Sequence, residues 1–138
     1  MEGMKASVVD RDEVRVMFLR VADQVPAIED GWERLESVVP PKGRRFYGAF
    51  HAVANEYWVC VEPVEGDDPI RLGLEMGVLP GGPYLRTTLR GEPPGVYLRI
   101  APTFEELIKD AAVDESRPGI EFYRRGNEID LLLPIRTG

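Results

Sequence analysis

The sequence predicts an α+β domain in which an antiparallel sheet carries helices on one face. Segments rich in valine, isoleucine and aromatic residues alternate with two segments whose apolar residues recur at helical spacing. The order strand, helix, strand, strand occurs twice along the chain, which indicates a duplication. Because helices cover one face of such a sheet, the other face is either solvated or forms a cleft.

In the first half of the chain, a strand is predicted at 13–21. A helix starts at Pro26, because proline is tolerated in the first helical turn, and it ends at Pro40. Strands at 44–52 and 56–64 follow as a hairpin. The apolar stripe that turns this helix toward the core consists of Ile28, Trp32, Leu35 and Val39.

In the second half, the helical pattern is interrupted at Pro102, because an interior proline removes a backbone hydrogen bond. We therefore predict a first turn over 95–100 and a main helix over 103–113. A Pro-Gly-Gly-Pro segment makes a kink or tight turn between two strands. The strands of this half are predicted at 72–79, 84–90, 120–125 and 128–135.

The closing strand of each half supports the duplication. Residues 55–64 and 127–135 both begin Asn-Glu, alternate apolar residues and finish at a proline followed by a β-branched residue. The side chains predicted to face the helices are Tyr57, Val59, Val61, Ile129, Leu131, Leu133 and Ile135. Those predicted to lie on the opposite face are Trp58, Cys60, Asp130 and Leu132. A tryptophan on that face hints at a binding surface.

Glu121 and Tyr123 share one face of their strand, because side chains alternate along a strand. A carboxylate beside an aromatic ring can hold a cation or polarise a small molecule, and each cation–π contact would add about 0.5–2 kcal/mol. The alternative is a solvated sheet glutamate next to a surface tyrosine. The sequence pattern leaves both readings of this strand open.

Composition limits the expected partners. The chain has 138 residues with 17 basic and 24 acidic side chains, a net charge of −7, so nucleic acid is not expected as a direct partner. No apolar run approaches a membrane span and no signal-peptide pattern is visible, which favours a cytoplasmic protein. We expect one domain over 13–138 after a loose N-terminus at 1–12.

Cysteine and histidine are each present once, as Cys60 and His51. A single cysteine excludes an internal disulfide, and a single histidine excludes a histidine-rich metal site, so neither a metal nor a cofactor is expected. The two residues lie on neighbouring strands of a hairpin and would suit covalent catalysis as a pair. A buried, inert thiol is the simpler interpretation.

Short motifs follow one another in a fixed order over residues 13–136. They are Trp32, Tyr47-Gly48, Glu56-Tyr57, Leu79-Pro80-Gly81-Gly82-Pro83-Tyr84, Arg90-Gly91, Ile120-Glu121-Phe122-Tyr123 and Leu133-Pro134-Ile135-Arg136. Their order and spacing resemble the GyrI-like small-molecule-binding domain, which is also the effector-binding domain of bacterial multidrug-responsive transcription activators.

The resemblance implies two strand-helix-strand-strand units related by a pseudo-two-fold axis, forming a curved sheet with a ligand cleft between the halves. Relatives bind amphipathic, often cationic aromatic compounds there, on a buried glutamate and aromatic rings. Glu121 and Tyr123 match the Glu-x-Tyr motif of the family. We predict that the cleft lies on the sheet face opposite the helices and that Trp58, Tyr84 and Tyr47 also line it.

Two features depart from the family pattern. Pro102 interrupts the second helix, and the short loop between the last two strands would reduce the rim of the cleft. Too few residues precede the first strand for a helix-turn-helix unit, so a complete DNA-binding activator is not expected.

The leading hypothesis is a stand-alone domain that senses or sequesters hydrophobic or cationic aromatic compounds. One alternative is a hydrolase of reactive electrophiles, with Glu121 as general base and Tyr123 as its catalytic partner. Another is a protein-binding regulator, such as a gyrase-inhibitor-like module. The sequence leaves the oligomeric state open.

Overall fold

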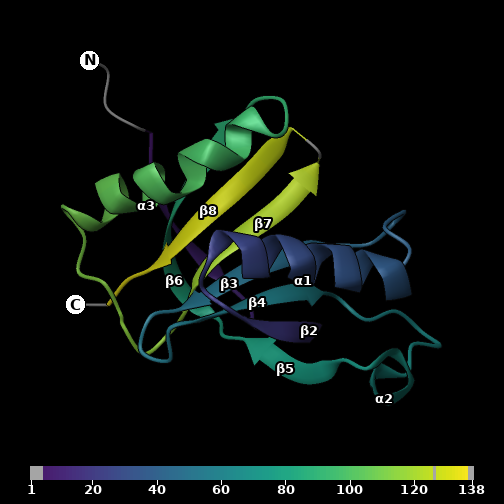
Figure 1. Cartoon of the computed structure of the whole chain (residues 1–138). Helices are drawn as coiled ribbons and strands as arrows, with labels where there is room; N and C mark the ends of the chain where they lie inside the picture. The colour runs from purple at the N-terminus through teal and green to yellow at the C-terminus, as the bar shows by residue number, and fades with distance from the viewer. Residues whose placement is uncertain (1–4, 126, 137–138) are drawn as a thin grey trace.

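A computed structural model gives the fold of residues 5–125 and 127–136. The first half contains β1 (Ser7–Arg11), β2 (Val14–Ala22), α1 (Val25–Val38), β3 (Phe46–His51) and β4 (Glu56–Val61). The second half contains α2 (Pro69–Leu72), β5 (Glu75–Leu79), β6 (Gly82–Arg90), the 3₁₀ helix η1 (Gly95–Arg99), α3 (Ile100–Ile108), β7 (Gly119–Arg125) and β8 (Glu128–Pro134). The strands form one antiparallel, eight-stranded sheet, so the predicted α+β class is confirmed (Figure 1).

Proline lies in the first turn of α1 and of α3. In α1, proline occupies the first turn, and the helix stops before Pro40. Pro102 is the third residue of α3, where the backbone N–H of an α-helix has no partner within the helix in any case. Proline therefore does not break α3, and the predicted break at this residue was wrong.

The strand order of the sheet is β1-β6-β8-β7-β3-β4-β2-β5. Strands β1 to β4 correspond to β5 to β8, and exchanging each strand with its counterpart reproduces the same order in reverse. The predicted duplication is therefore present in the topology, with a pseudo-two-fold axis between β3 and β7. Each edge strand pairs with the other half, β1 with β6 and β5 with β2, which ties the halves together.

Residues 7–11, which we expected in a loose terminus, form strand β1. Val8 pairs with Leu85 and Val9 with Tyr84 of β6. Because the partner strand lies more than 70 residues further along the chain, the pairing is non-local and leaves little signal in a short polar segment.

Two apolar clusters occupy the sheet face covered by the helices. One joins Leu35 and Val39, from α1 and its end, to Val59 and Val61 of β4. The other joins Val96 of η1 to side chains of β6 and β8. The predicted orientation of the two closing strands is therefore confirmed. None of the helices over the described residues is long and apolar enough to cross a membrane.

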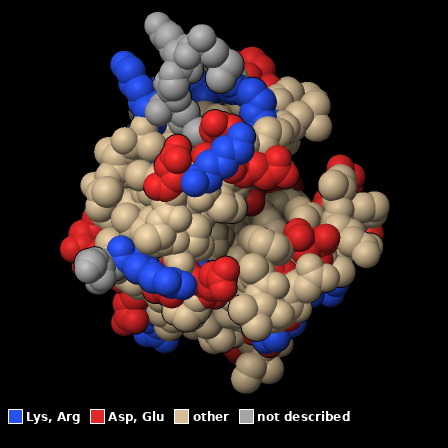
Figure 2. Space-filling view, turned by 90° about the vertical axis from the view of Figure 1, so that its left-hand side faces the viewer, with Lys and Arg blue, Asp and Glu red and all other residues tan. Residues whose placement is uncertain are grey.

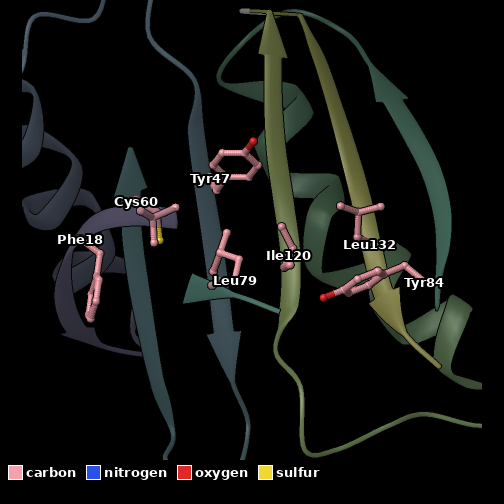
Figure 3. Packing of buried hydrophobic residues seen from close by; sticks show 9 residues of the cluster. Phe18, Tyr47, Cys60, Leu79, Tyr84, Ile120 and Leu132 are labelled. Atoms are coloured by element: carbon pink, nitrogen blue, oxygen red, sulfur yellow. The ribbon is translucent and has the colours of Figure 1, made fainter. Parts of the chain in front are cut away.

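The opposite face of the sheet, where we expected the cleft, carries an apolar cluster of its own. Figure 3 shows that each strand from β2 to β8 contributes a side chain to it. The labelled members are Phe18, Tyr47, Cys60, Leu79, Tyr84, Ile120 and Leu132. Because the sheet buries side chains on both faces, apolar content alone does not identify the face that the helices cover.

Candidate functional site

Glu121 lies on β7, beside the pseudo-two-fold axis. It pairs with Gly48 of β3 and with Leu131 of β8, and residues directly opposite each other in an antiparallel sheet share a face. Leu131 belongs to the cluster under η1 and α3. Glu121 and Tyr123 therefore lie on the face that the helices cover, not on the opposite face as we predicted.

The carboxylate of Glu121 is buried, with 8% of the residue exposed. The Tyr57 hydroxyl donates a hydrogen bond to its Oε1 at 2.8 Å, and the Tyr123 hydroxyl donates a second to the same oxygen at 2.5 Å. Oε2 accepts no hydrogen bond from any described residue. Among the described residues, one oxygen is thus held by two phenols and the other has no hydrogen-bond donor.

The duplication places Gly48 at the position equivalent to Glu121. Gly48 pairs with Val59 in the first hairpin, and Glu121 pairs with Leu131 in the second. Val59 and Leu131 are equivalent in the aligned closing strands. Because Gly48 and Glu121 also pair with each other, the carboxylate and the glycine face one another across the axis.

Aromatic side chains from both halves surround the Tyr123 ring. Trp32 of α1 meets this ring edge-on, with 5.3 Å between the ring centroids. Tyr97 of η1 also meets it edge-on, at 6.3 Å. Figure 1 shows α1 and α3 over separate parts of the sheet, with β7 and β8 between them. The Glu121 site therefore lies on the helix-covered face, between α1 and η1.

Burial raises the pKa of Glu121 above 4.5, and the hydrogen bonds from Tyr123 and Tyr57 partly oppose this rise. Burial and the neighbouring carboxylate hold the pKa values of both tyrosines well above 10, so they remain hydrogen-bond donors. Among the side chains that the structure describes, no basic one forms an ion pair with Glu121. Within that part of the chain, the site therefore presents a carboxylate without a counter-cation.

Glu121→Gln is expected to stabilise the fold at neutral pH, and this gain should vanish in acid. Folding raises the pKa of Glu121, so the native state binds the proton more tightly than the unfolded state does. The loss of folding stability caused by the ionised carboxylate is therefore absent below the pKa of the unfolded state, and it grows as the pH rises through the pKa of the native state. Urea unfolding of the wild type and the variant from pH 4 to 8 measures the difference.

Asp114→Asn provides a control of opposite sign. Hydrogen bonds from Ser116 and Arg117 hold the pKa of Asp114 at about 2, so this variant should lose stability above pH 4. A Glu121→Gln variant that is less stable than the wild type at pH 7 would contradict the assigned penalty.

The other three predicted site residues lie on the opposite face of the sheet and serve packing. The Tyr47 hydroxyl donates to Glu62 at 2.6 Å, and the Tyr84 hydroxyl donates to the Pro80 carbonyl at 2.5 Å. Trp58 stacks on Phe18 with 3.8 Å between ring centroids. The structure thus brings Glu121 and Tyr123 together but separates them from Tyr47, Trp58 and Tyr84.

Cys60 and His51 do not form a catalytic pair. In the hairpin register Cys60 lies opposite Tyr47, whereas His51 lies opposite Glu56 at the other end of the strand. Burial raises the pKa of the Cys60 thiol well above 9, which disfavours the reactive thiolate. Among the described residues, no group of three or more histidine, cysteine, aspartate or glutamate side chains could hold a metal ion.

Sequence reasoning missed four residues that shape the Glu121 site. Tyr57 was assigned to the helix-facing side, and Trp32 to the stripe of the first helix, but neither was linked to Glu121. Gly48 appeared only within a motif, and its role depends on its cross-strand partner. Tyr97 carried no local signal, because its position depends on how η1 crosses the sheet.

No protein-family model and no curated protein sequence matches the chain. Solved structures match it over nearly its whole length. An integron cassette protein from the mobile metagenome of Vibrio cholerae has a TM-score of 0.76 at 15% identity, covering 95% of each chain. SAV2435, solved with bound tetraphenylphosphonium, has a TM-score of 0.72 at 13% identity, covering 97% of this chain and 95% of its own.

The C-terminal domain of EcmrR has a TM-score of 0.65 at 12% identity, with 98% of this chain and 99% of that domain covered. At these identities the likeness concerns the fold, and it extends over both halves of the duplicated sheet.

Proposed function

This chain has the GyrI-like fold, and on that premise we propose that it is a small-molecule-binding domain for hydrophobic or cationic aromatic compounds. The proposed site is centred on Glu121. Tyr57 and Tyr123 position its carboxylate, and Trp32 and Tyr97 supply aromatic surface from the two halves.

The observation that carries the proposal is a buried carboxylate with no ionic partner among the described residues. Removing a carboxylate from water is unfavourable unless hydrogen bonds or a cation compensate. Two phenols compensate in part at Oε1 of Glu121, and Oε2 is left for a ligand. A cation next to Oε2 would restore the missing charge.

The aromatic rings suit a ligand whose charge is spread over an apolar body. Cation–π contacts contribute roughly 0.5–2 kcal/mol each. Trp32 and Tyr97, from the two halves of the chain, both contact the Tyr123 ring edge-on, so a bulky ligand that reaches this ring would displace one of them. Tyr97 is 45% exposed and sits on a short 3₁₀ helix, which makes it the easier of the two to displace.

Tetraphenylphosphonium, the compound bound to SAV2435, is a suitable probe. We expect it to bind the wild-type chain, and Glu121→Gln to weaken binding by about 10- to 100-fold, because the attraction between unit charges roughly 6–10 Å apart at an effective dielectric constant of about 20 is roughly 2–3 kcal/mol. Titration followed by tryptophan fluorescence or calorimetry measures both affinities.

Asp130→Asn is the matched control, because Asp130 is the other buried carboxylate of the described residues and lies on the opposite face. Its affinity for tetraphenylphosphonium should equal that of the wild type. Equal affinities of wild type and Glu121→Gln would refute the electrostatic role of Glu121.

The hydrolase alternative uses the same carboxylate. Its raised pKa suits a general base, and the Tyr123 hydroxyl, which donates to Oε1 at 2.5 Å, would orient that base. Turnover of a reactive electrophile that is lost in Glu121→Gln, but retained in Asp130→Asn, would distinguish catalysis from binding alone.

A further inference from the structure

An open groove of about 710 Å³ lies along β6, on the far side of the second half from β3 and β4. Strand β1 pairs with β6 only as far as Ser7 and Arg86. Beyond that pair, the groove runs between the edge of β6 and the start of α3. Its volume is in the range of small-molecule sites.

The groove is basic, although the chain as a whole is acidic. Lys5, Arg86, Arg90 and Arg99 line it, and Glu106 is the only acidic residue among the described residues that line it. Glu106 forms an ion pair with Lys109 at 3.0 Å. Among the described residues, none of the four cations forms an ion pair of its own.

Two arginines of the groove are held in a row. Arg86, Thr88 and Arg90 alternate along β6 and therefore point to the same side of the strand, on the sheet face opposite α3. They line the groove at the free edge of β6. On the neighbouring strand β8, Asp130 pairs with Thr88 and Glu128 with Arg90.

Both of these carboxylates have partners already. Arg124 lies 3.7 Å from Asp130 and 3.6 Å from Glu128, and the Thr88 hydroxyl donates to Asp130 at 2.7 Å. They are thus engaged away from the groove, and the two guanidinium groups of the row keep their charge for another ligand.

We propose that this groove binds a phosphorylated small molecule. Guanidinium groups match phosphate oxygens in charge and in bidentate geometry, and the Ser7 hydroxyl adds a donor beside Arg86. A nucleic acid would need an extended basic surface. Figure 2 instead shows basic and acidic side chains interspersed over the face in view, with no extended basic surface.

The groove shares no lining residue with the Glu121 site, so this proposal stands independently of the function proposed above. Inorganic pyrophosphate is the test ligand, measured by calorimetry on the full chain. We expect saturable 1:1 binding to the wild type and at least about tenfold weaker binding after Arg86→Gln and Arg90→Gln are combined.

The matched control combines Arg34→Gln and Arg71→Gln, two exposed arginines on α1 and α2 outside the groove. It removes the same total charge and should bind like the wild type. Changes in the NMR chemical shifts of backbone amides when pyrophosphate is added to the wild type, confined to residues around Thr88 and Thr103, would locate the ligand independently of any variant.

Absence of saturable binding, or equal weakening in both double variants, would overturn the proposal. Tighter binding of a single-stranded oligonucleotide than of pyrophosphate, lost in the same Arg86/Arg90 variant, would overturn the choice of a small phosphorylated ligand.

Discussion

Gly48→Ala is expected to destabilise the fold by about 1–3 kcal/mol, the usual range for overpacking a filled interior. A Cβ at this position would lie 1.8 Å from the Tyr57 hydroxyl oxygen and 3.0 Å from Oε1 of Glu121. Tyr57 is buried in the cluster under α1 and cannot withdraw without disturbing it. Denaturant unfolding measures the loss.

The same variant should also weaken tetraphenylphosphonium binding, because displacing the Tyr57 ring breaks its 2.8 Å hydrogen bond to Glu121. Gly95→Ala is the control, since a Cβ there meets no atom within 4 Å. Combining Gly48→Ala with Tyr57→Phe should give a smaller total destabilisation than the sum of the two single changes, because the phenylalanine lacks the oxygen at 1.8 Å and keeps only the Cζ contact at 2.6 Å. Additive losses would contradict this steric account.

Arg117→Ala is expected to cost about 2–4 kcal/mol, which lowers the melting temperature by roughly 6–12 °C. The side chain is 12% exposed and lies just before β7. Its guanidinium donates to the carbonyls of Gly81, Pro83 and Ile135. It also lies 4.7 Å from the centroid of the Tyr84 ring.

These contacts connect the chain before β7 to the start of β6 and the end of β8, so their loss loosens one end of the second half. Arg117→Lys should give an intermediate stability, because an ammonium group cannot match the spread of the guanidinium donors. Arg34→Ala, on an exposed part of α1, should leave the melting temperature unchanged. A melting temperature for Arg117→Ala equal to that of Arg34→Ala would show that these contacts contribute nothing.

The position of Glu121 shows where prediction from the sequence stopped. Alternation correctly placed Glu121 and Tyr123 on one side of β7 and Ile120 on the other. It did not identify which side the helices cover, because Ile120 belongs to the opposite cluster and is as buried as the helix-facing residues. Register with β3 settles the matter, by pairing Glu121 with Gly48.

The aromatic residues illustrate the same limit. Trp58 and Tyr84 are aromatic residues of the kind that line binding surfaces. Each instead packs against neighbours on the sheet face opposite Glu121. Trp32 was assigned to the core from its helical spacing, and it does pack against the apolar cluster under α1. Its edge-on contact with Tyr123 follows from where α1 packs on the sheet, which no local pattern encodes.

Local pattern was enough to predict the α+β class, the strand-helix-strand-strand order that recurs in both halves and the repeated closing strands, because each depends on short-range periodicity and turn chemistry; it missed β1 and α2. Only the tertiary structure shows that β1 and β5 each pair with a strand of the other half. It also shows that Glu121 faces a glycine across the pseudo-two-fold axis. Strand partners and register are set by the burial of both sheet faces at once. That requirement joins residues far apart in the chain, so a local pattern cannot specify it.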